Sequence, residues 1–291
     1  MTLRELQSRF LPSLAPEDFF LLIAHATGEE KVFLLAHPEY ELSPEVATKV
    51  EAYLRRRLEH EPVAYITGHR EFYGREFRVT RDTLIPRPET EHLIETALNA
   101  IFNFQFSIFK NIDIIDVGTG SGNIIITLAK EIEKRSHQAE IKYFALDISK
   151  SALAIAKDNA MRHDIATKIT FLESDLLKHL PVSLLQDHHL IITANLPYLS
   201  HNIYHESDPD VRDYEPASAL VSGEDGLDHY VRLLTEIHTF LPHVRSLTFF
   251  FEISPEQTTL LTTHIRTVFP QVTPLVFQDL SGRDRLIQAT I

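Results

Sequence analysis

Four consecutive residues, Asn195 to Tyr198, combine groups that could hold and orient a planar nitrogen group. The carboxamide oxygen of Asn195 and the main-chain carbonyl of Leu196 can each accept one hydrogen bond from an NH2 group, and Tyr198 can lie against its plane. Pro197 fixes the local backbone and so helps to hold both acceptors in one orientation. Because two acceptors favour positive charge developing on a weakly nucleophilic amide nitrogen, the pattern indicates group transfer to nitrogen. The simpler interpretation is a strand-ending turn in which Asn195 caps the backbone.

A glycine-rich turn before this motif is a candidate cofactor site. It follows an apolar strand and opens a helix, and its glycines let the backbone turn sharply and approach a ligand. The residues concerned are Gly118, Thr119, Gly120, Ser121 and Gly122. A dinucleotide-binding turn has its third glycine three positions after its second, so this spacing disfavours NAD. Taken alone, such a turn is often only a tight connection.

Two acidic residues follow the next two strands. Asp147 ends the strand after the glycine turn, where a carboxylate is expected to accept hydrogen bonds from ribose hydroxyls. In the loop after the following strand, Asp175 could accept a hydrogen bond from the exocyclic amine of adenine while Leu176 covers the ring. On its own, Asp175 could equally be a helix cap. We expect Asn195 to contact the cofactor as well as the acceptor.

Strands and helices alternate from residue 112 onward, which predicts an α/β fold with a doubly wound, mostly parallel sheet. We expect strands at 112–117, 141–146, 169–173, 190–194 and 247–253. Helices are expected at 123–135, 150–162, 228–240 and 256–268, with Ser149 and Ser254 as caps. Segments 272–279 and 285–291 flank Ser281-Gly282 and predict an antiparallel hairpin at the sheet edge. The segment 101–109 fits neither period clearly and is assigned no function.

The first seventy residues have helical periodicity, with apolar residues spaced near 3.6 after Pro16-Glu17 and again after Ser43-Pro44, and they predict a small helical bundle. The pattern then changes to two short strands about Gly74-Arg75. We therefore expect a helical domain at 1–70, a β-hairpin linker at 71–85 and a catalytic domain at 86–291.

Composition excludes several classes of protein. The 291 residues contain no cysteine, which excludes disulfides, thiolate nucleophiles and thiolate-ligated zinc. With 41 acidic and 28 basic side chains the formal net charge is -13, which repels nucleic-acid phosphates. The longest apolar stretches are far shorter than the roughly 20 residues that cross a bilayer, and the N-terminus does not have the pattern of a secretory signal. We therefore expect a cytoplasmic enzyme with neither a membrane partner nor a direct nucleic-acid substrate.

Two further signals carry less weight. His201 and His205 have the spacing of two metal ligands on a helix, but no third ligand has a matching spacing, so we predict a polar surface and no metal site. Arg87 lies between two prolines. It could brace the loop at residues 195–198, called the acceptor loop below, or form an ion pair with Glu89 or Glu91.

The order of glycine turn, ribose acid and adenine acid over three strands resembles the S-adenosylmethionine-dependent methyltransferase fold throughout residues 112–291. This resemblance implies S-adenosylmethionine as the cofactor. The cofactor's sulfonium carries the chemistry, so the protein chiefly orients an acceptor toward its methyl group.

The whole chain also resembles the protein-glutamine N5-methyltransferase family, which modifies the Gly-Gly-Gln loop of class I peptide-chain release factors. Six segments carry the resemblance: LLAHP at 34–38, EPVAYITG at 61–68, TLIPRPETE at 83–91, DYEP at 213–216, GEDGLD at 223–228 and DLSGRDR at 279–285. It implies that domain 1–70 recognises the release factor, that Asn195, Pro197 and Tyr198 are catalytic, and that residues 195–198 bind the glutamine.

One position departs from this family, because Leu196 stands where the family usually has a second proline. That variant resembles methyltransferases acting on adenine N6 in ribosomal RNA, which are the main alternative. A nucleotide-binding or NAD-dependent redox protein would need the other glycine spacing, and an inactive adaptor would not need an intact Asn195. The acidic balance and the match along the full chain favour a protein substrate.

Overall fold

The structure, a computed structural model, describes residues 1–102, 111–135, 140–181 and 188–291. The chain forms two compact units. The first comprises Met1–His69 together with the short segment Asp208–Tyr214, and the second comprises Arg70–Ser207 and Glu215–Ile291. Residues 103–109 of the ambiguous segment lie outside the described residues.

The first unit is a helical bundle, as its sequence predicts. Its helices are α1 (Leu3–Phe10), α2 (Pro16–Thr27), α3 (Lys31–Ala36), α4 (Pro44–Leu58), α5 (Val63–Thr67) and α10 (Pro209–Arg212). Ser43 caps α4 by accepting a hydrogen bond from the backbone N–H of Val46. Leu3, Phe19, Leu22 and Val50 are among the fully buried residues of its core. The bundle is therefore held together chiefly by burial of one apolar face of each longer helix.

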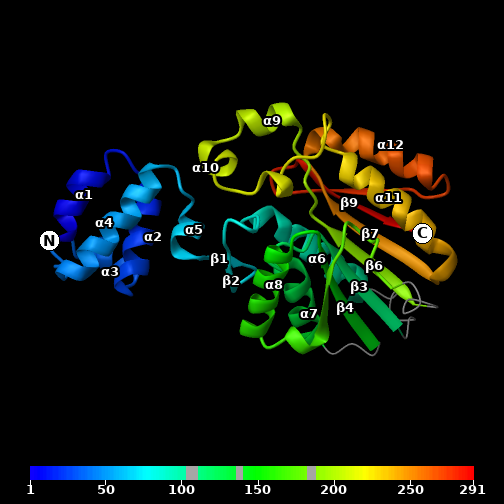
Figure 1. The fold of residues 1–291 in the computed structure, drawn as a ribbon, viewed down its shortest axis with the longest axis horizontal. Helices are drawn as coiled ribbons and strands as arrows, with labels where there is room; N and C mark the ends of the chain where they lie inside the picture. The colour runs from blue at the N-terminus through cyan, green and yellow to red at the C-terminus, as the bar shows by residue number, and fades with distance from the viewer. Residues whose placement is uncertain (103–110, 136–139, 182–187) are drawn as a thin grey trace. The chain divides into compact units, whose positions relative to one another are not determined.

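The second unit is built on a seven-stranded sheet of order β5-β4-β3-β6-β7-β9-β8 (Figure 1). The strands are β3 (Asn111–Val117), β4 (Glu140–Asp147), β5 (Ile169–Glu173), β6 (His189–Ala194), β7 (Ser246–Glu252), β8 (Leu275–Gln278) and β9 (Asp284–Thr290). All pairs from β5 to β7 are parallel, whereas β9 is antiparallel to β7 and β8. The mostly parallel sheet and its antiparallel edge hairpin are thus confirmed.

Helices cover both faces of this sheet (Figure 1). The α-helices are α6 (Glu91–Phe102), α7 (Asn123–Arg135), α8 (Lys150–Arg162), α9 (His201–Glu206), α11 (Asp228–Phe240) and α12 (Thr258–Val268). Short 3-10 helices lie at η1 (Pro88–Thr90), η2 (Ala166–Lys168), η4 (Ala217–Ala219), η5 (Leu241–His243) and η6 (Pro255–Gln257). Alternate residues of β3 point to opposite faces: Ile115 and Val117 join a core with α11 and α12, whereas Ile112 and Ile114 join a core with α6 and α7.

Both predicted serine caps are confirmed. Ser149 accepts a hydrogen bond from the backbone N–H of Ala152 at the start of α8. Ser254 forms a reciprocal capping box with Gln257, although the turn it caps is the 3-10 helix η6, so α12 begins two residues later than expected. The predicted pair of short strands is also present, as β1 (His69–Phe72) and β2 (Arg75–Arg78). Within the described residues, no helix is long and apolar enough to cross a membrane.

Candidate active site

Strand register brings the predicted site residues together. Val117 of β3 pairs with Leu146 of β4 on one side and with Ala194 of β6 on the other. The residues that follow these three are Gly118, Asp147 and Asn195, so all three lie at the carboxyl edge of the sheet, where Asp147 is the last residue of β4 and pairs with Glu173 of β5. The chain order reverses between β3 and β6, and ligands of doubly wound folds bind at such a switch point.

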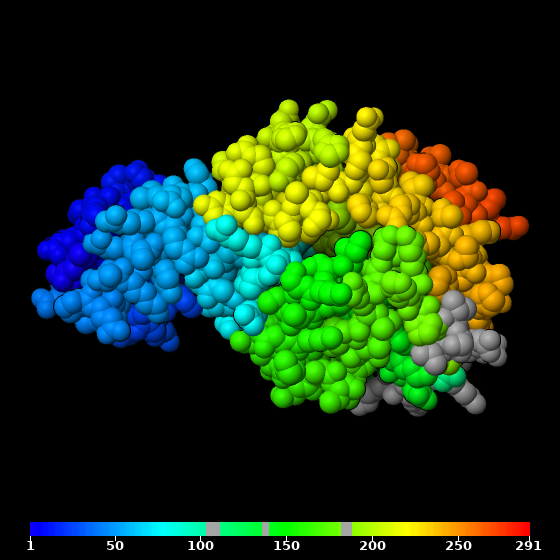
Figure 2. Space-filling view, in the orientation of Figure 1, coloured from blue at the N-terminus to red at the C-terminus, as the bar shows by residue number. Residues whose placement is uncertain are grey.

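A cavity of 310 Å³ lies at this edge. Figure 2 shows the surface hollowed where green segments, which include residues 147–152, meet yellow ones, which include residues 216–219. Most of the predicted site residues line it: Gly118, Thr119, Gly120, Ser121, Asp147, Asp175, Leu176, Asn195, Leu196 and Pro197. Gly122 and Tyr198 are not among the described residues that line it. The sequence thus predicts the location of the cavity and the larger part of its lining on the sheet side.

The Asp147 carboxylate organises the glycine turn. One carboxylate oxygen accepts the backbone N–H of Gly120 at 2.8 Å, and the other accepts that of Ser149 at 2.9 Å. Burial raises the pKa of Asp147, and these backbone hydrogen bonds oppose that rise. Because each carboxylate oxygen has two acceptor sites, Asp147 retains capacity for a ligand hydroxyl.

The glycines serve different purposes. Gly118 has φ +73°, and a Cβ there would lie 2.9 Å from the Cδ2 atom of Leu196, so the side chain at position 196 packs directly on the turn. A Cβ at Gly122 would lie 2.9 Å from Ile126 and 3.2 Å from Ala156, so this glycine permits packing between the turn and α8. Gly120 has φ +53° and open space around its Cα, as a residue facing a ligand would. Gly122 therefore shapes the site without lining it.

Buried Asp116 joins the turn to the neighbouring strand. Its carboxylate accepts the hydroxyl hydrogens of Thr119 at 2.7 Å and Thr193 at 2.8 Å. Burial raises the pKa of Asp116 to about 6, although both hydrogen bonds act to lower it. Asp116 has no role predicted from sequence, yet it links the ends of β3 and β6 through these two hydrogen bonds.

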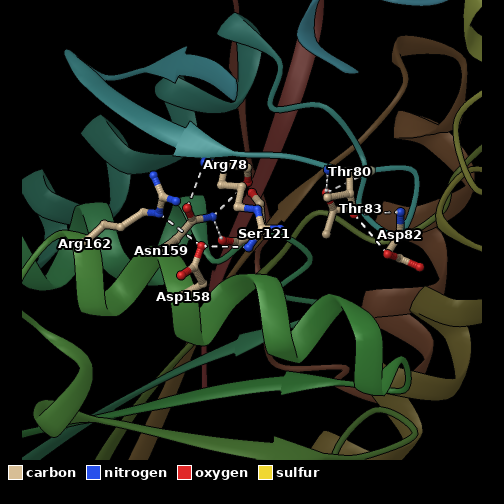
Figure 3. A network of polar contacts seen from close by, with 8 residues as sticks. All are labelled: Arg78, Thr80, Asp82, Thr83, Ser121, Asp158, Asn159 and Arg162. Atoms are coloured by element: carbon tan, nitrogen blue, oxygen red, sulfur yellow. Dashed lines mark hydrogen bonds and ion pairs between the residues drawn. The ribbon is translucent and has the colours of Figure 1, made fainter. Parts of the chain in front are cut away.

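Asn159 is a second residue that sequence reasoning missed. This fully buried side chain on α8 accepts the backbone N–H of Arg78 at 2.8 Å, and its NH2 group donates to the carbonyls of Arg78 at 3.0 Å and Ser121 at 2.8 Å. Figure 3 shows Asn159 between these two residues. A lone asparagine on the apolar face of a predicted helix is a usable signal for such an anchor, because buried amides must be hydrogen-bonded.

The loop after β5 contains Asp175, whose carboxylate has more partners within the protein than expected. Asp175 lines the cavity, but its oxygens already form ion pairs with Lys178 at 2.5 Å and with Arg232 at 2.7 Å. The hydrogen bonds from these two cations lower the pKa of Asp175. Leu176 is buried and has φ +53°, a left-handed conformation that is unfavourable for a leucine and places its side chain at the cavity wall. The adenine contact through Asp175 stays a prediction.

The acceptor loop is anchored from two directions. The Asn195 amide nitrogen donates to the hydroxyl of Thr90 at 3.1 Å, and the backbone N–H of Leu196 donates to the hydroxyl of Tyr230 at 3.2 Å. Tyr230 is fully buried on α11, and its own hydroxyl hydrogen can be donated to the carbonyl of Glu252 or, at 3.3 Å, to that of Ala194. Neither Thr90 nor Tyr230 could be linked to the loop from local sequence patterns.

Tyr198 differs in position from the other residues of its motif. Its ring packs against the core between the sheet and α11, and its carbonyl accepts a hydrogen bond from Gln257 at 2.8 Å. Burial raises its pKa. The expected stacking of Tyr198 on a planar acceptor stays a prediction.

A second wall of the cavity comes from residues 81–90, which the sequence analysis did not assign to the site. Arg87 in this wall forms an ion pair with Glu215, whereas the sequence left open a pair with Glu89 or Glu91 or a role in bracing the acceptor loop. Glu215 is 4% exposed, and its other oxygen accepts the backbone N–H of Ile85 at 3.0 Å. The pair therefore braces the loop that contributes Pro216, Ser218 and Ala219 to the cavity. Among the described residues, no group of three potential metal ligands lies close together.

Two parts of the chain match models of known protein domains. Residues 3–68 match the model of the PrmC N-terminal domain, and residues 108–210 match that of a methyltransferase domain. The catalytic domain of METTL16, solved in complex with an RNA hairpin, superposes with a TM-score of 0.56 at 13% identity, covering 84% of this chain and 81% of that one. That likeness shows a shared fold.

Curated relatives are closer in sequence. A release factor glutamine methyltransferase of Nitratidesulfovibrio vulgaris is 36% identical over 280 residues, which are 96% of this chain and 88% of the relative. One of Bacillus subtilis is 35% identical over 271 residues, covering 93% and 90% of the two chains. Identity of this extent over nearly the whole chain, together with the match to the PrmC N-terminal domain, shows that the chain belongs to the release factor glutamine methyltransferase family.

Proposed function

We propose that this enzyme transfers a methyl group from S-adenosylmethionine to the side-chain amide nitrogen of the glutamine in the Gly-Gly-Gln loop of class I release factors. The observation that carries the proposal is the register of β3 and β6, which sets Asn195 and the carbonyl of Leu196 directly beside the glycine turn. Membership of the family supports the choice of a release factor as substrate.

The cavity residues fit this cofactor. A volume of 310 Å³ lies at the lower end of the range for small-molecule sites, about 300 to 1,000 Å³. Gly120 leaves room for close approach of a ligand to the backbone, Asp147 offers carboxylate oxygens to ribose hydroxyls, and Leu176 offers an apolar surface to a planar ring. When bound, the cofactor supplies an electrophilic methyl group.

The chain's own residues then prepare the acceptor. An amide nitrogen is a poor nucleophile because its lone pair is delocalised into the carbonyl group. Hydrogen bonds from the glutamine NH2 to the Asn195 side-chain oxygen and the Leu196 carbonyl would orient that nitrogen. They would also strengthen as positive charge develops on it, so their effect is mainly on turnover. Pro197 and Tyr198 complete the proposed catalytic set by stiffening the loop and covering the planar group.

We assign recognition of the release factor to the helical domain, proposed as residues 1–70, followed by a linker at 71–85 and the catalytic domain at 86–291. The glycine turn and the acceptor loop both lie in the last of these. Because its proposed substrate acts in translation, we place the enzyme in the cytoplasm.

A second candidate is methylation of adenine N6 in RNA, which Leu196 favours because this variant of the motif resembles methyltransferases that act on adenine N6 in ribosomal RNA. The net charge of -13 opposes it. Incubation with labelled S-adenosylmethionine and a panel of release factor, unrelated protein and RNA separates the two. We expect label on the release factor alone, with mass spectrometry locating one methyl group on its glutamine; label on RNA alone would reject the proposal.

A further inference from the structure

One buried carboxyl group, that of Glu252, lies next to the acceptor loop. Phe251 of β7 pairs with Ala194 of β6, so Glu252, the last residue of β7 and the partner of Leu286 on β9, lies next to Asn195 at the edge of the sheet. The Glu252 side chain is 2% exposed and is not among the described residues that line the cavity. A carboxyl group in such a place is costly to bury, so the contacts that it makes are informative.

Its contacts are with the two residues that face the acceptor. Thr90 and Asn195 both form side-chain hydrogen bonds with the carboxyl group of Glu252. The hydroxyl of Thr90 also accepts a hydrogen bond from the Asn195 amide nitrogen at 3.1 Å. Thr90 is 1% exposed, and both it and Asn195 line the cavity. The NH2 group of Asn195 is therefore directed to acceptors inside the protein, first among them the Thr90 hydroxyl.

This arrangement decides which way the asparagine amide is turned. An asparagine amide has one acceptor end and one donor end, and the hydrogen-bond network around it determines their placement. With the NH2 end held by Thr90 and Glu252, the carbonyl oxygen is the end available to a ligand. The opposite orientation would set that oxygen against the carboxyl group of Glu252 and offer a donor where the proposed substrate also offers one.

We propose that Glu252 is a positioning residue that, with Thr90, holds the Asn195 amide with its carbonyl oxygen toward the acceptor nitrogen. This inference rests on the proposed function, since it assumes that the acceptor is an NH2 group. Glu252 does not touch the substrate; it acts through Asn195. Its negative charge also favours positive charge developing on the acceptor nitrogen at close range in a water-poor site.

Several charged and titratable groups surround Glu252, and they come from different elements. Arg285 on β9 favours its ionised form and Glu89 on η1 opposes it, while the phenols of Tyr198 and Tyr230 also face it. Burial is the largest influence and raises the pKa of Glu252 to about 7, although Thr90 and Asn195 act to lower it. Its charge therefore changes within the range in which the enzyme can be assayed.

The variant that tests the charge is Glu252→Gln. A glutamine can keep its side-chain oxygen toward Thr90 and Asn195, but it removes the charge. It also places an NH2 group at the position of Oε2, which is buried and has no hydrogen-bond partner in the described part of the chain. A hydrogen bond to a charged group commonly contributes about 1.5 to 3 kcal/mol, so we expect kcat to fall roughly 10- to 100-fold. Cofactor affinity should stay within about twofold, because Asn195 would remain in place.

Two controls accompany it. Asp113→Asn removes another fully buried carboxylate of the same sheet, one bonded to His188 at 2.7 Å and remote from the cavity, and should leave kcat unchanged. Thr90→Val removes the bridging hydroxyl whereas Thr90→Ser keeps it. Thr90→Ser should therefore retain more activity than Thr90→Val, by about 2- to 10-fold.

The pH dependence provides a readout that a merely structural role would not affect. In the wild-type enzyme kcat/KM for the release factor should rise with pH through a limb near pH 7, as Glu252 ionises, and this limb should be absent from Glu252→Gln. Wild-type kcat and an unchanged limb in a folded Glu252→Gln enzyme would overturn the proposal.

A measurement without substrate or cofactor separates this proposal from the function on which it rests. In nuclear magnetic resonance spectra of the cofactor-free protein, the side-chain NH2 signals of Asn195 should shift with pH around a midpoint near 7, and the shift should vanish in Glu252→Gln. Failure of the wild type to methylate a release factor would reject the proposed function, and the spectra would still decide this inference. Asn195 signals that do not respond to pH, or that respond equally in both proteins, would overturn it.

Discussion

Replacement of Leu196 by proline tests whether the acceptor loop works through its backbone. The change restores the residue usual in the family and keeps the carbonyl that is proposed to hold the acceptor. It removes the N–H that donates to Tyr230 at 3.2 Å, and it shortens a side chain that is 4% exposed and packs on Gly118. Chemistry and stability should therefore respond differently.

The magnitude follows from these contacts. Loss of one neutral hydrogen bond costs about 1 kcal/mol, and loss of one buried carbon costs about 0.8 kcal/mol. Proline offsets about 0.5 kcal/mol of this by restricting the unfolded chain. We expect the free energy of unfolding to fall by about 1 to 1.5 kcal/mol, while kcat on release factor stays within about threefold of wild type.

The assay combines denaturant unfolding with steady-state methyl transfer. A double-mutant cycle with Tyr230→Phe should give a coupling free energy of about 1 kcal/mol, because each change removes the same Leu196 to Tyr230 hydrogen bond. A loss of more than tenfold in kcat from a stably folded Leu196→Pro enzyme would refute the reasoning, since the residue's side chain or N–H would then act in catalysis.

Three other predictions concern the cofactor site, the buried carboxyl group and the division of labour. Asp147→Ala should weaken cofactor binding by roughly one to two powers of ten in calorimetric titration, because it removes the proposed acceptor of the ribose hydroxyls and the carboxylate that holds Gly120 at 2.8 Å. Unchanged affinity would remove Asp147 from the site. Since the pKa of Glu252 is raised from 4.5 to about 7, its protonated form favours the folded state, and this contribution is lost as pH rises. The unfolding free energy of wild type minus that of Glu252→Gln should therefore decrease by about 3 kcal/mol between pH 4.5 and 7 and then level off. If denaturant titrations show that this difference does not change with pH, the assigned pKa is wrong. A chain lacking residues 1–70 should bind cofactor but methylate intact release factor poorly, and equal efficiency in a transfer assay would show that the helical domain is not needed for recognition.

The fold was predictable where a local sequence pattern favours one kind of local structure. Residues 190–194 are a short, mostly apolar run with β-branched residues, which favours a strand buried on both faces, and β6 is buried along its whole length. The turn from Gly118 to Gly122 needs positive φ at three positions, which glycine alone adopts readily. These features, together with parallel strand order, also place Asp147 and Asn195 correctly at the edge of the sheet.

The supporting contacts were not predictable because they join residues far apart in the chain. Arg87 and Glu215 are separated by 128 positions, and nearby Glu89 and Glu91 are equally reasonable partners until the backbone is known. Thr90 and Asn195 are separated by 105 positions, and nothing local marks the threonine as a hydrogen-bond partner. Glu252 offered a weak signal, since an acidic residue that ends a buried apolar strand must have a partner.

The central claim is that Asn195 orients the acceptor amide and stabilises charge during transfer. The most direct test is the rate of methyl transfer to release factor by Asn195→Ala in single turnover, with cofactor affinity measured on the same preparation. Because removal of one preorganised partner of the transition state commonly costs about 10² to 10³ in rate, we predict a loss of that order with nearly unchanged affinity. A folded Asn195→Ala enzyme that transfers methyl groups at the wild-type rate would contradict the mechanism, even with methylglutamine confirmed as the product.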